Sequence, residues 1–411
     1  MTDVTMTPGP GIGAGPPDQD RGAPLSVRRT WLAELALGIG GLALGTGEFA
    51  AMGILPQMAE ATGVPIAKAG TLISAYALGV VIGAPGLAII FARAPRRTML
   101  IALMIGFLFA NILSAMAQSY GMLFAARFIA GLPHGLYFGL AALVAASLAP
   151  PGRQAQAIAR VMLGLTIANV IGVPAAAAAG QWFGWRATFV LVAGLGLLTA
   201  ILISLYVPRQ PASEGASPLQ ELSGLRRPQL WLTLLIAAVG FGGIFAVYTY
   251  IVPLIVEVGG ISMSWVPLIL SLVGCGMVAG IMFGGWLADR GVMLAIGTTL
   301  VVNGLVLLAI GIFPHGPYTL VANLMVMGAG IAVVPGFQMR LMEVAGEAQA
   351  LAASLNHAAF NAANALGAWL GGVVVTAGYG WQSTGVVGAA LALGGCVIFG
   401  VSLIVARRQT S

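Results

Sequence analysis

The sequence predicts an all-α membrane protein of twelve transmembrane helices, arranged as two six-helix halves that are related by a parallel pseudo-repeat. Three observations support this fold class: the composition, the placement of the charges and a weak internal repeat. The chain is 59% hydrophobic and only 7% charged, with a mean hydropathy of +0.98. These values exclude an ordinary soluble domain. The 59 glycines suit helices that approach one another closely in lipid.

Apolar segments of sufficient length recur along the whole chain, since a spanning helix needs about 20 mostly apolar residues. The predicted spans are residues 31–57, 69–91, 98–118, 122–147, 155–181, 187–207, 229–256, 264–287, 293–313, 317–340, 349–376 and 383–406. Residues 1–29 are rich in Pro and Gly and predict a disordered cytoplasmic tail. The polar stretch 208–228 predicts a cytoplasmic linker between an N-terminal half, 30–207, and a C-terminal half, 229–411.

The basic residues indicate how the spans are oriented. With the N-terminus in the cytoplasm, the outer side receives only Lys68 and Arg186, and Arg127 falls inside a span. The cytoplasmic side then receives Arg21, Arg28, Arg29, Arg93, Arg96, Arg97, Arg153, Arg160, Arg209, Arg226, Arg227, Arg290, Arg340, Arg407 and Arg408. This positive-inside bias predicts a multi-pass inner-membrane protein with both termini in the cytoplasm.

The two halves share local patterns in the same order. An Ala-Asn-x-x-Gly motif occurs at 168–172 and again at 363–367, and a Gly-Trp pair follows at 184–185 and at 380–381. Further matches 197 residues apart are Pro56/Pro253, Arg93/Arg290, Gly79/Gly276, Gly83/Gly280, Gly131/Gly328 and Gly139/Gly336. The ordered motifs predict a parallel repeat, whereas isolated glycine matches are expected in so glycine-rich a chain.

Several classes of function lack a signal in the sequence. No Cys/His cluster has metal-ligand spacing, and no phosphate-binding glycine loop of the Walker type occurs, so we expect no metal, no cofactor and no ATP hydrolysis. The two cysteines, Cys275 and Cys396, lie within apolar segments and are expected to be packing residues. Despite the pI of 9.7, the basic residues follow the membrane and predict no nucleic-acid partner.

Two charged residues, Glu48 and Arg127, lie well inside predicted spans, where an ionised side chain is costly and usually functional. Glu48 is interpreted as a carboxylate that loads and releases a proton, and the alternative is a permanent ion pair or a hydrogen-bonded contact between helices. Arg127, Gly131 and His134 share one helix face. His134 is interpreted either as part of a proton path or as a polar residue on a cavity wall. Glu34, near the start of its span, is interpreted as structural.

Five segments resemble one known family. They are GTGEFAAMGILPQMA (45–59), ARFIAGLPHGLYFGLAALVAASLAP (126–150), GFGGIFAVYTYIVPL (240–254), GGWLADRG (284–291) and AAFNAANALGAWLGG (358–372). Together they resemble the bacterial drug:proton antiporters of the major facilitator superfamily, in particular the sugar-efflux, arabinose-permease-like members. The resemblance covers roughly residues 30–406. It implies a transporter with its substrate path between the halves, and a role for Arg127 in tuning a nearby proton site.

The resemblance also implies a cytoplasmic gate. The family's signature after the second helix, Gly-x-x-x-Asp-Arg-x-Gly-Arg-Arg, has Ala92 here in the place of its aspartate, whereas the copy in the second half keeps Asp289. A latch between the halves is therefore expected to rest more on the second copy. The predicted gate residues are Arg93, Arg96, Arg97, Asp289, Arg290 and Arg340, the last interpreted together with Glu343.

Polar residues in the predicted spans are candidates for the substrate cavity. They are Asn169, Tyr248, Gln338, His357, Asn361 and Asn364. Structural hydrogen bonding between helices is the alternative for the asparagines, and simple packing is the alternative for the tyrosine. The repeat relation of Asn169 to Asn364 favours a symmetric structural role near the bundle centre.

We therefore predict a monomeric, proton-coupled exporter of a small organic molecule, whose partners are that substrate, protons and the lipid bilayer. It is not an enzyme. Related families leave the substrate open among sugars, nucleosides, drugs and other metabolites. An inward-working proton symporter is the first alternative, and a membrane receptor that binds without transport is the second.

Overall fold

The computed structural model describes residues 27–91, 94–150, 154–209, 227–313, 316–345 and 349–410. Residues 1–26 of the predicted tail, residues 210–226 of the predicted linker and the predicted gate residue Arg93 lie outside the described residues. Within the described ranges, twelve helical stretches are long and apolar enough to cross a membrane. The fold class predicted from composition and hydropathy is therefore confirmed.

The first half contains six of these stretches. Its elements are α1 (Val27–Gly53), α2 (Leu55–Thr62), α3 (Ile66–Ala69), α4 (Thr71–Ile90), α5 (Arg96–Met116), α6 (Tyr120–Leu148), α7 (Gln154–Ile167), the π-helical turn η1 (Ala168–Gly172), α8 (Val173–Phe183) and α9 (Trp185–Tyr206). The fifth span runs through α7, η1 and α8. The π-helical turn precedes Pro174, which has no N–H for the regular helical hydrogen bond.

The second half repeats this arrangement with more interruptions. Its elements are α11 (Pro228–Leu235), η3 (Ile236–Gly240), α12 (Gly242–Tyr248), α13 (Ile251–Pro253), η4 (Leu254–Val258), η5 (Met263–Trp265), α14 (Val266–Ala288), α15 (Val292–Ile312), α16 (Pro317–Ala329), η6 (Gly330–Ala332), α17 (Val333–Ala345), α18 (Gln349–Thr376) and α19 (Ser383–Thr410). The bounds of α18 coincide with the predicted span 349–376.

The first predicted span is not one continuous helix. It was predicted over 31–57, but α1 ends at Gly53, and Ile54 leaves the helical conformation at φ −123°. Pro56 lacks an N–H and its ring crowds the preceding turn, which favours a break at this point. Tyr250 has a similar φ of −108° shortly before Pro253 in the second half. The interruption therefore belongs to the repeat.

Glycines bring the second and fourth spans of each half into close contact. A Cβ on Gly131 of α6 would lie 2.0 Å from the Tyr76 carbonyl oxygen of α4. The repeat-related Gly328 of α16 would place a Cβ 2.5 Å from the Val273 carbonyl oxygen of α14. Such distances exclude any larger residue without a shift of the backbone. The glycine matches found in the sequence thus correspond to the same helix contact in both halves.

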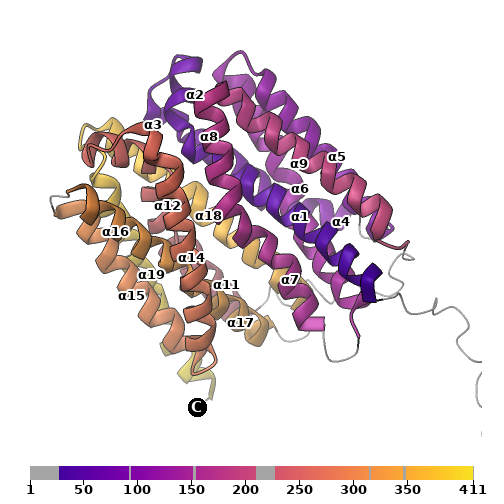
Figure 1. The fold of residues 1–411 in the computed structure, drawn as a ribbon. Helices are drawn as coiled ribbons and strands as arrows, with labels where there is room; N and C mark the ends of the chain where they lie inside the picture. Colours follow the sequence, from indigo (N-terminus) through magenta and orange to yellow (C-terminus); the bar gives the residue numbers. More distant parts are fainter. Residues whose placement is uncertain are drawn as a thin grey trace, which may run out of the picture.

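Both ends of the described chain lie at one end of the bundle, where α1 begins and α19 finishes (Figure 1). We call this the terminal end, and the opposite end, which carries α2 and α3, the far end. The arginine distribution predicts that the terminal end is cytoplasmic. At the far end the halves are closed on each other. The Tyr250 hydroxyl donates to the Ala368 carbonyl at 2.8 Å and contacts the Ala67 carbonyl of the other half at 3.3 Å.

Equivalent aromatic side chains meet near the middle of the molecule. Gly47-Glu48-Phe49-Ala50 in α1 corresponds to Gly243-Ile244-Phe245-Ala246 in α12. The rings of Phe49 and Phe245 stack with centroids 6.2 Å apart and an interplanar angle of 8°. A self-complementary contact of this kind is expected where two related halves face each other. Ile244 holds the position that Glu48 occupies in the first half, so the carboxylate has no counterpart.

Candidate functional site

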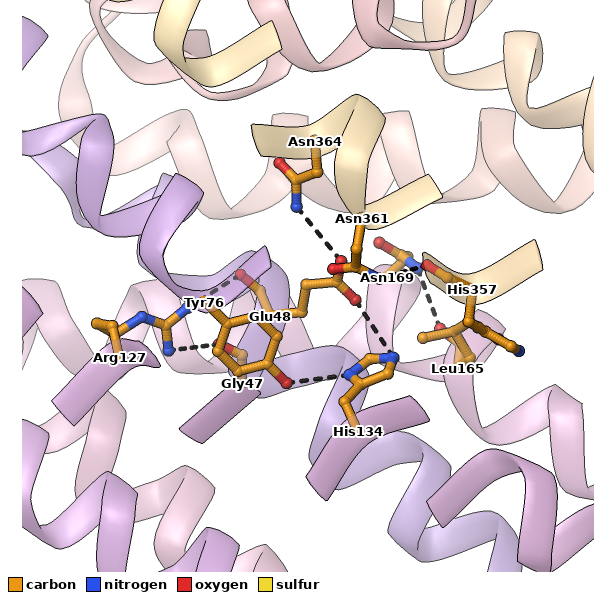
Figure 2. A network of polar contacts seen from close by, with 10 residues as sticks. All are labelled: Gly47, Glu48, Tyr76, Arg127, His134, Leu165, Asn169, His357, Asn361 and Asn364. Carbon is orange, nitrogen blue, oxygen red and sulfur yellow. Dashed lines mark hydrogen bonds and ion pairs between the residues drawn. The ribbon is translucent and has the colours of Figure 1, made fainter. Parts of the chain in front are cut away.

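Glu48 of α1 lies buried between the two halves, with 5% of its surface exposed. Its Oε1 accepts a hydrogen bond of 3.3 Å from the Asn364 amide nitrogen of α18, which belongs to the other half (Figure 2). Because Glu48 and Asn364 belong to different halves, this hydrogen bond depends on how the two halves are placed relative to each other.

His134 of α6 lies on the other side of the same carboxylate. Its Nε2 is 3.8 Å from Glu48 Oε2, and its Nδ1 is 3.0 Å from the Tyr76 hydroxyl of α4 (Figure 2). Tyr76 was not among the predicted site residues, because a single tyrosine in an apolar segment is usually a packing residue. The close approach of α4 to α6 at Gly131 brings Tyr76 to this position.

Arg127 is fully buried, and its guanidinium bonds to the backbone of α1. It donates to the Gly47 carbonyl at 2.9 Å and to the Glu48 carbonyl at 3.5 Å, and it lies over the Tyr76 ring at 4.5 Å. Figure 2 shows it on the side of α1 away from the Glu48 carboxyl group. Within the described residues no ion pair joins Arg127 to this carboxylate, whereas the bond from Asn364 is a hydrogen-bonded helix contact of the kind that the structural alternative for Glu48 expected. Arg127 instead fixes the helix segment that carries Glu48.

Three buried asparagines leave their amide oxygens without a donor among the described residues. The side-chain amide nitrogen of Asn364 donates a hydrogen bond to Glu48. Asn361 donates to the His357 carbonyl at 3.0 Å, and Asn169 of η1 donates to the Leu165 carbonyl at 3.0 Å. The Oδ1 atom of each is buried and unpaired. Because an unpaired buried acceptor is costly, these oxygens are positions where a ligand donor would be favourable.

The expected symmetry between Asn169 and Asn364 holds for the backbone and fails for the side chains. Gly172 and Gly367, three residues after each asparagine, both pack against the first helical span of their own half, at Thr46 and Gly242. Only Asn364 reaches a carboxylate, because the first half alone carries Glu48. The symmetry between the two asparagines therefore does not extend to the partners of their side chains.

Aromatic residues from both halves complete the region. His357 of α18 stacks on Phe138 of α6 with ring centroids 5.1 Å apart, and the His134 ring lies 6.2 Å from the His357 ring. The Tyr248 ring packs edge-on against Phe49 at 6.0 Å. Tyr248 and His357 thus lie at the interface between the halves.

Gln338 differs from the other predicted cavity residues. Its Oε1 accepts from the Asn356 amide at 2.5 Å, and both residues belong to the second half. Asn356 was not predicted. This bond joins α17 to α18 and gives Gln338 a structural partner.

The predicted gate residues lie toward the terminal end, and the contacts described for them remain within one half. Arg97 donates to the Ser204 carbonyl, Arg290 donates to the Trp286 carbonyl at 3.0 Å and lies over its ring, and Arg340 pairs with Glu343 at 3.2 Å. The Asp289 side chain is exposed, and Arg290 turns toward Trp286. Arg96 also has an interaction partner. The contacts of Arg97, Arg290 and Arg340 named above each lie within one half.

Glu34 forms a bidentate pair with Arg160, at 2.5 and 2.9 Å, between α1 and α7. Its interpretation as a structural charge is consistent with this pair, which lies within the first half.

Two related six-helix halves, joined around a buried carboxylate, define a membrane transport protein. The profile of the Major Facilitator Superfamily matches residues 37–349. The inner membrane transport protein YdhP of Escherichia coli K12 is 42% identical over 359 residues, covering 87% of this chain and 92% of that protein. A chloramphenicol resistance protein of Streptomyces lividans is 34% identical, covering 89% and 92%.

The fold agrees with these sequence matches. A crystal structure of a bacterial homologue of the human lysosomal transporter Spinster superposes with a TM-score of 0.73 at 15% identity, covering 92% of this chain and 98% of that one. The putative transporter AraJ of E. coli K12 is 32% identical over 353 residues, covering 85% of this chain and 89% of that protein. The chain belongs to the major facilitator superfamily and is a membrane transporter, as its motifs predicted.

Proposed function

We propose that this protein is a proton-coupled antiporter that exports a small organic molecule, and that Glu48 carries the proton. The observation that carries the proposal is the position of the Glu48 carboxylate between the halves, held by Asn364 from one half and next to His134 from the other. A buried carboxylate without a permanent cation is stabilised by taking up a proton or by receiving donors from a ligand.

The Glu48–Asn364 bond supplies a means of coupling. A hydrogen bond to an ionised carboxylate is about twice as strong as one between neutral groups, so loss of the proton strengthens the contact between the halves. In this state the far end is held closed by Asn364 and by the Tyr250 contacts. The deprotonated, empty transporter is thereby kept from opening to the far side.

A substrate that donates to Glu48 competes with Asn364 for the same oxygen. Its binding from the terminal end releases the bond between the halves and permits the far end to open. A proton arriving from the far side then replaces the substrate on Glu48. Because proton and substrate use one carboxylate in turn, their movements are opposite, which is antiport. When the terminal end opens again, Glu48 releases its proton on that side, and the site is once more deprotonated and empty.

The surroundings favour a substrate with hydroxyl or amino donors on an apolar frame. The unpaired oxygens of Asn169, Asn361 and Asn364 would accept from such donors. The rings of Tyr248 and His357 would cover its apolar faces. The name of the S. lividans relative, a chloramphenicol resistance protein, is in keeping with export of a hydroxylated aromatic compound.

The test uses purified wild-type protein in liposomes that contain a pH-sensitive dye. A thermal-shift screen of sugars, nucleosides and amphenicol drugs first selects the compound that raises the melting temperature most. With that compound, antiport predicts that an imposed compound gradient drives protons in the opposite direction. It also predicts that the compound binds more weakly as the pH falls, because protons compete for Glu48.

The alternatives give different results in the same experiment. Proton movement in the same direction as the compound, together with binding that does not weaken at low pH, would identify a symporter. Binding without any transport in sealed vesicles would identify a receptor. Compound transport with no proton movement would remove proton coupling from the proposal.

A further inference from the structure

A cavity lies at the far end, and its lining does not include Glu48. It has a volume of about 650 Å³ and is open to the surroundings. Its walls are α2, the turn from α8 to α9, and the short helix η5 of the other half. The residues that matter for its chemistry are Gln57, Glu60, Gln181, Trp182, Trp185 and Ser264. None of them belongs to the site around Glu48.

The polar groups of this cavity are incompletely paired. The Gln57 amide oxygen and the Gln181 amide nitrogen are both buried and have no hydrogen-bond partner in the described part of the chain. They offer one acceptor and one donor to a ligand. Because an unpaired buried amide group is costly, a ligand that meets both groups is favoured.

The negative charge and the exposed aromatic surface of this cavity indicate that its ligand is a cation. The Glu60 carboxylate lines the cavity and makes no ion pair with any described residue. The indole of Trp182 is 77% exposed at the rim, and an ammonium group over an indole face is attracted to it. Arg186 does not line the cavity; it donates to the Ala117 carbonyl at 3.1 Å and lies over the Trp185 ring.

We propose that this cavity binds a protonated amine that carries a neighbouring oxygen, as in an amino alcohol or an amino sugar. The ammonium group pairs with Glu60 and Gln57, and the neighbouring oxygen accepts from Gln181. A soluble amino alcohol and the ethanolamine headgroup of a membrane lipid both have this chemistry. This site goes beyond the proposed proton-coupled export and does not depend on it.

Occupation of the cavity has a consequence for the transporter. Gln57 and Gln181 belong to the first half, whereas Ser264 belongs to the second, so the cavity is complete only while the far end is closed. A ligand that binds there stabilises that state and slows transport without competing for the central site.

Titration calorimetry tests whether the ligand is a soluble amine. The full-length protein is purified in detergent and stripped of lipid, and its binding of glucosamine is compared with its binding of glucose, the neutral analogue. Glucosamine is expected to bind and glucose is not. Glu60→Gln should weaken glucosamine binding about tenfold, since a charge-assisted bond is replaced by a neutral one. Gln181→Leu should weaken it as well. The matched control is Glu257→Gln, which removes an acidic group at the same end outside the cavity.

A second arm tests the lipid form. Nanodiscs that contain phosphatidylethanolamine should reduce glucosamine binding relative to phosphatidylglycerol nanodiscs if the headgroup occupies the cavity, and should leave it unchanged if the ligand is soluble. Both results are compatible with the shared amine chemistry. The proposal is overturned if glucosamine does not bind to the lipid-free protein, if glucose binds as tightly as glucosamine, or if Glu60→Gln and Glu257→Gln behave alike.

Discussion

The carboxylate of Glu48 and the amide of Asn364 form a hydrogen bond of 3.3 Å between residues that are 316 positions apart. One partner belongs to each half of the transporter. Ile244 replaces the carboxylate in the second half, and Asn169, the counterpart of Asn364, bonds to its own helix. The two halves thus share the same arrangement of helices, but among these equivalent positions only Glu48 of the first half is a carboxylate.

Glu48→Gln keeps the size of the side chain and removes its ability to carry a proton. We expect a folded protein that retains exchange of the compound along its gradient and loses pH-gradient-driven accumulation in inverted vesicles. Binding should also lose most of its pH dependence. Glu34→Gln is the control, because Glu34 pairs with Arg160 within one half. A stable Glu48→Gln protein with normal gradient-driven transport would exclude Glu48 from coupling.

Asn364→Ala removes the bond between the halves, whereas Asn169→Ala removes a bond within one helix. Because hydrogen bonds to charged groups contribute about 1.5–3 kcal/mol, Asn364→Ala should raise the ratio of far-end-open to far-end-closed protein roughly ten- to hundredfold. Thiol labelling of a cysteine at Ser74, measured at high and low pH, reports this opening. Asn169→Ala should leave the labelling close to that of the wild type. Equal labelling in both variants would contradict the assigned role of Asn364.

Tyr250→Phe removes the hydroxyl that bonds to Ala368 within its own half and contacts Ala67 of the other half at the far end. A loss of about 1 kcal/mol corresponds to a roughly fivefold shift toward the far-end-open state. Distances between spin labels at residues 64 and 262 would measure the shift. Tyr248→Phe serves as the control, because the Tyr248 hydroxyl forms no hydrogen bond with another described residue. A closed far end in both variants would show that the hydroxyl is not part of the closure.

Gly131→Ala and Gly139→Ala place the same methyl group at two positions of α6 with opposite surroundings. The first methyl would lie 2.0 Å from the Tyr76 carbonyl oxygen, whereas the second meets nothing within 4 Å. Gly131→Ala should therefore destabilise the protein by about 1–3 kcal/mol through forced separation of the helices. Gly139→Ala should be neutral or slightly stabilising. Melting temperatures in detergent compare the two, and equal values would contradict the close helix contact.

The orientation of the bundle in the membrane is a separate prediction. Alkaline phosphatase is active only on the outer side of the inner membrane, so fusions at residue 216 and at the C-terminus should both be inactive. A fusion at residue 118, between the third and fourth spans, should be active. The fifteen basic residues assigned to the cytoplasmic side are the reason for this expectation. An active fusion at residue 216 would place this linker on the outer side and contradict the predicted orientation.

Part of the site could be recognised from the sequence because charge is conspicuous in an apolar segment. Glu48 and Arg127 were identified in this way, and His134 through the helix face that it shares with Arg127; in the structure Arg127 bonds to the Glu48 backbone and His134 lies next to the Glu48 carboxylate. Tyr76 was missed, because an uncharged aromatic residue does not stand out among apolar neighbours. The backbone partners of Arg127 were also unpredictable, since every residue carries a carbonyl and only the fold selects which ones are reached.

The sequence by itself determined the twelve spans and the family, because hydropathy and motifs are properties of neighbouring residues and of their order. It also indicated which glycines repeat. Only the tertiary structure decided that Asn364 bonds to Glu48, that Gln338 bonds to Asn356, and that a cavity forms at the far end. These contacts join segments far apart in the chain, so they depend on how closely the glycines let the helices approach and on how the two halves are docked.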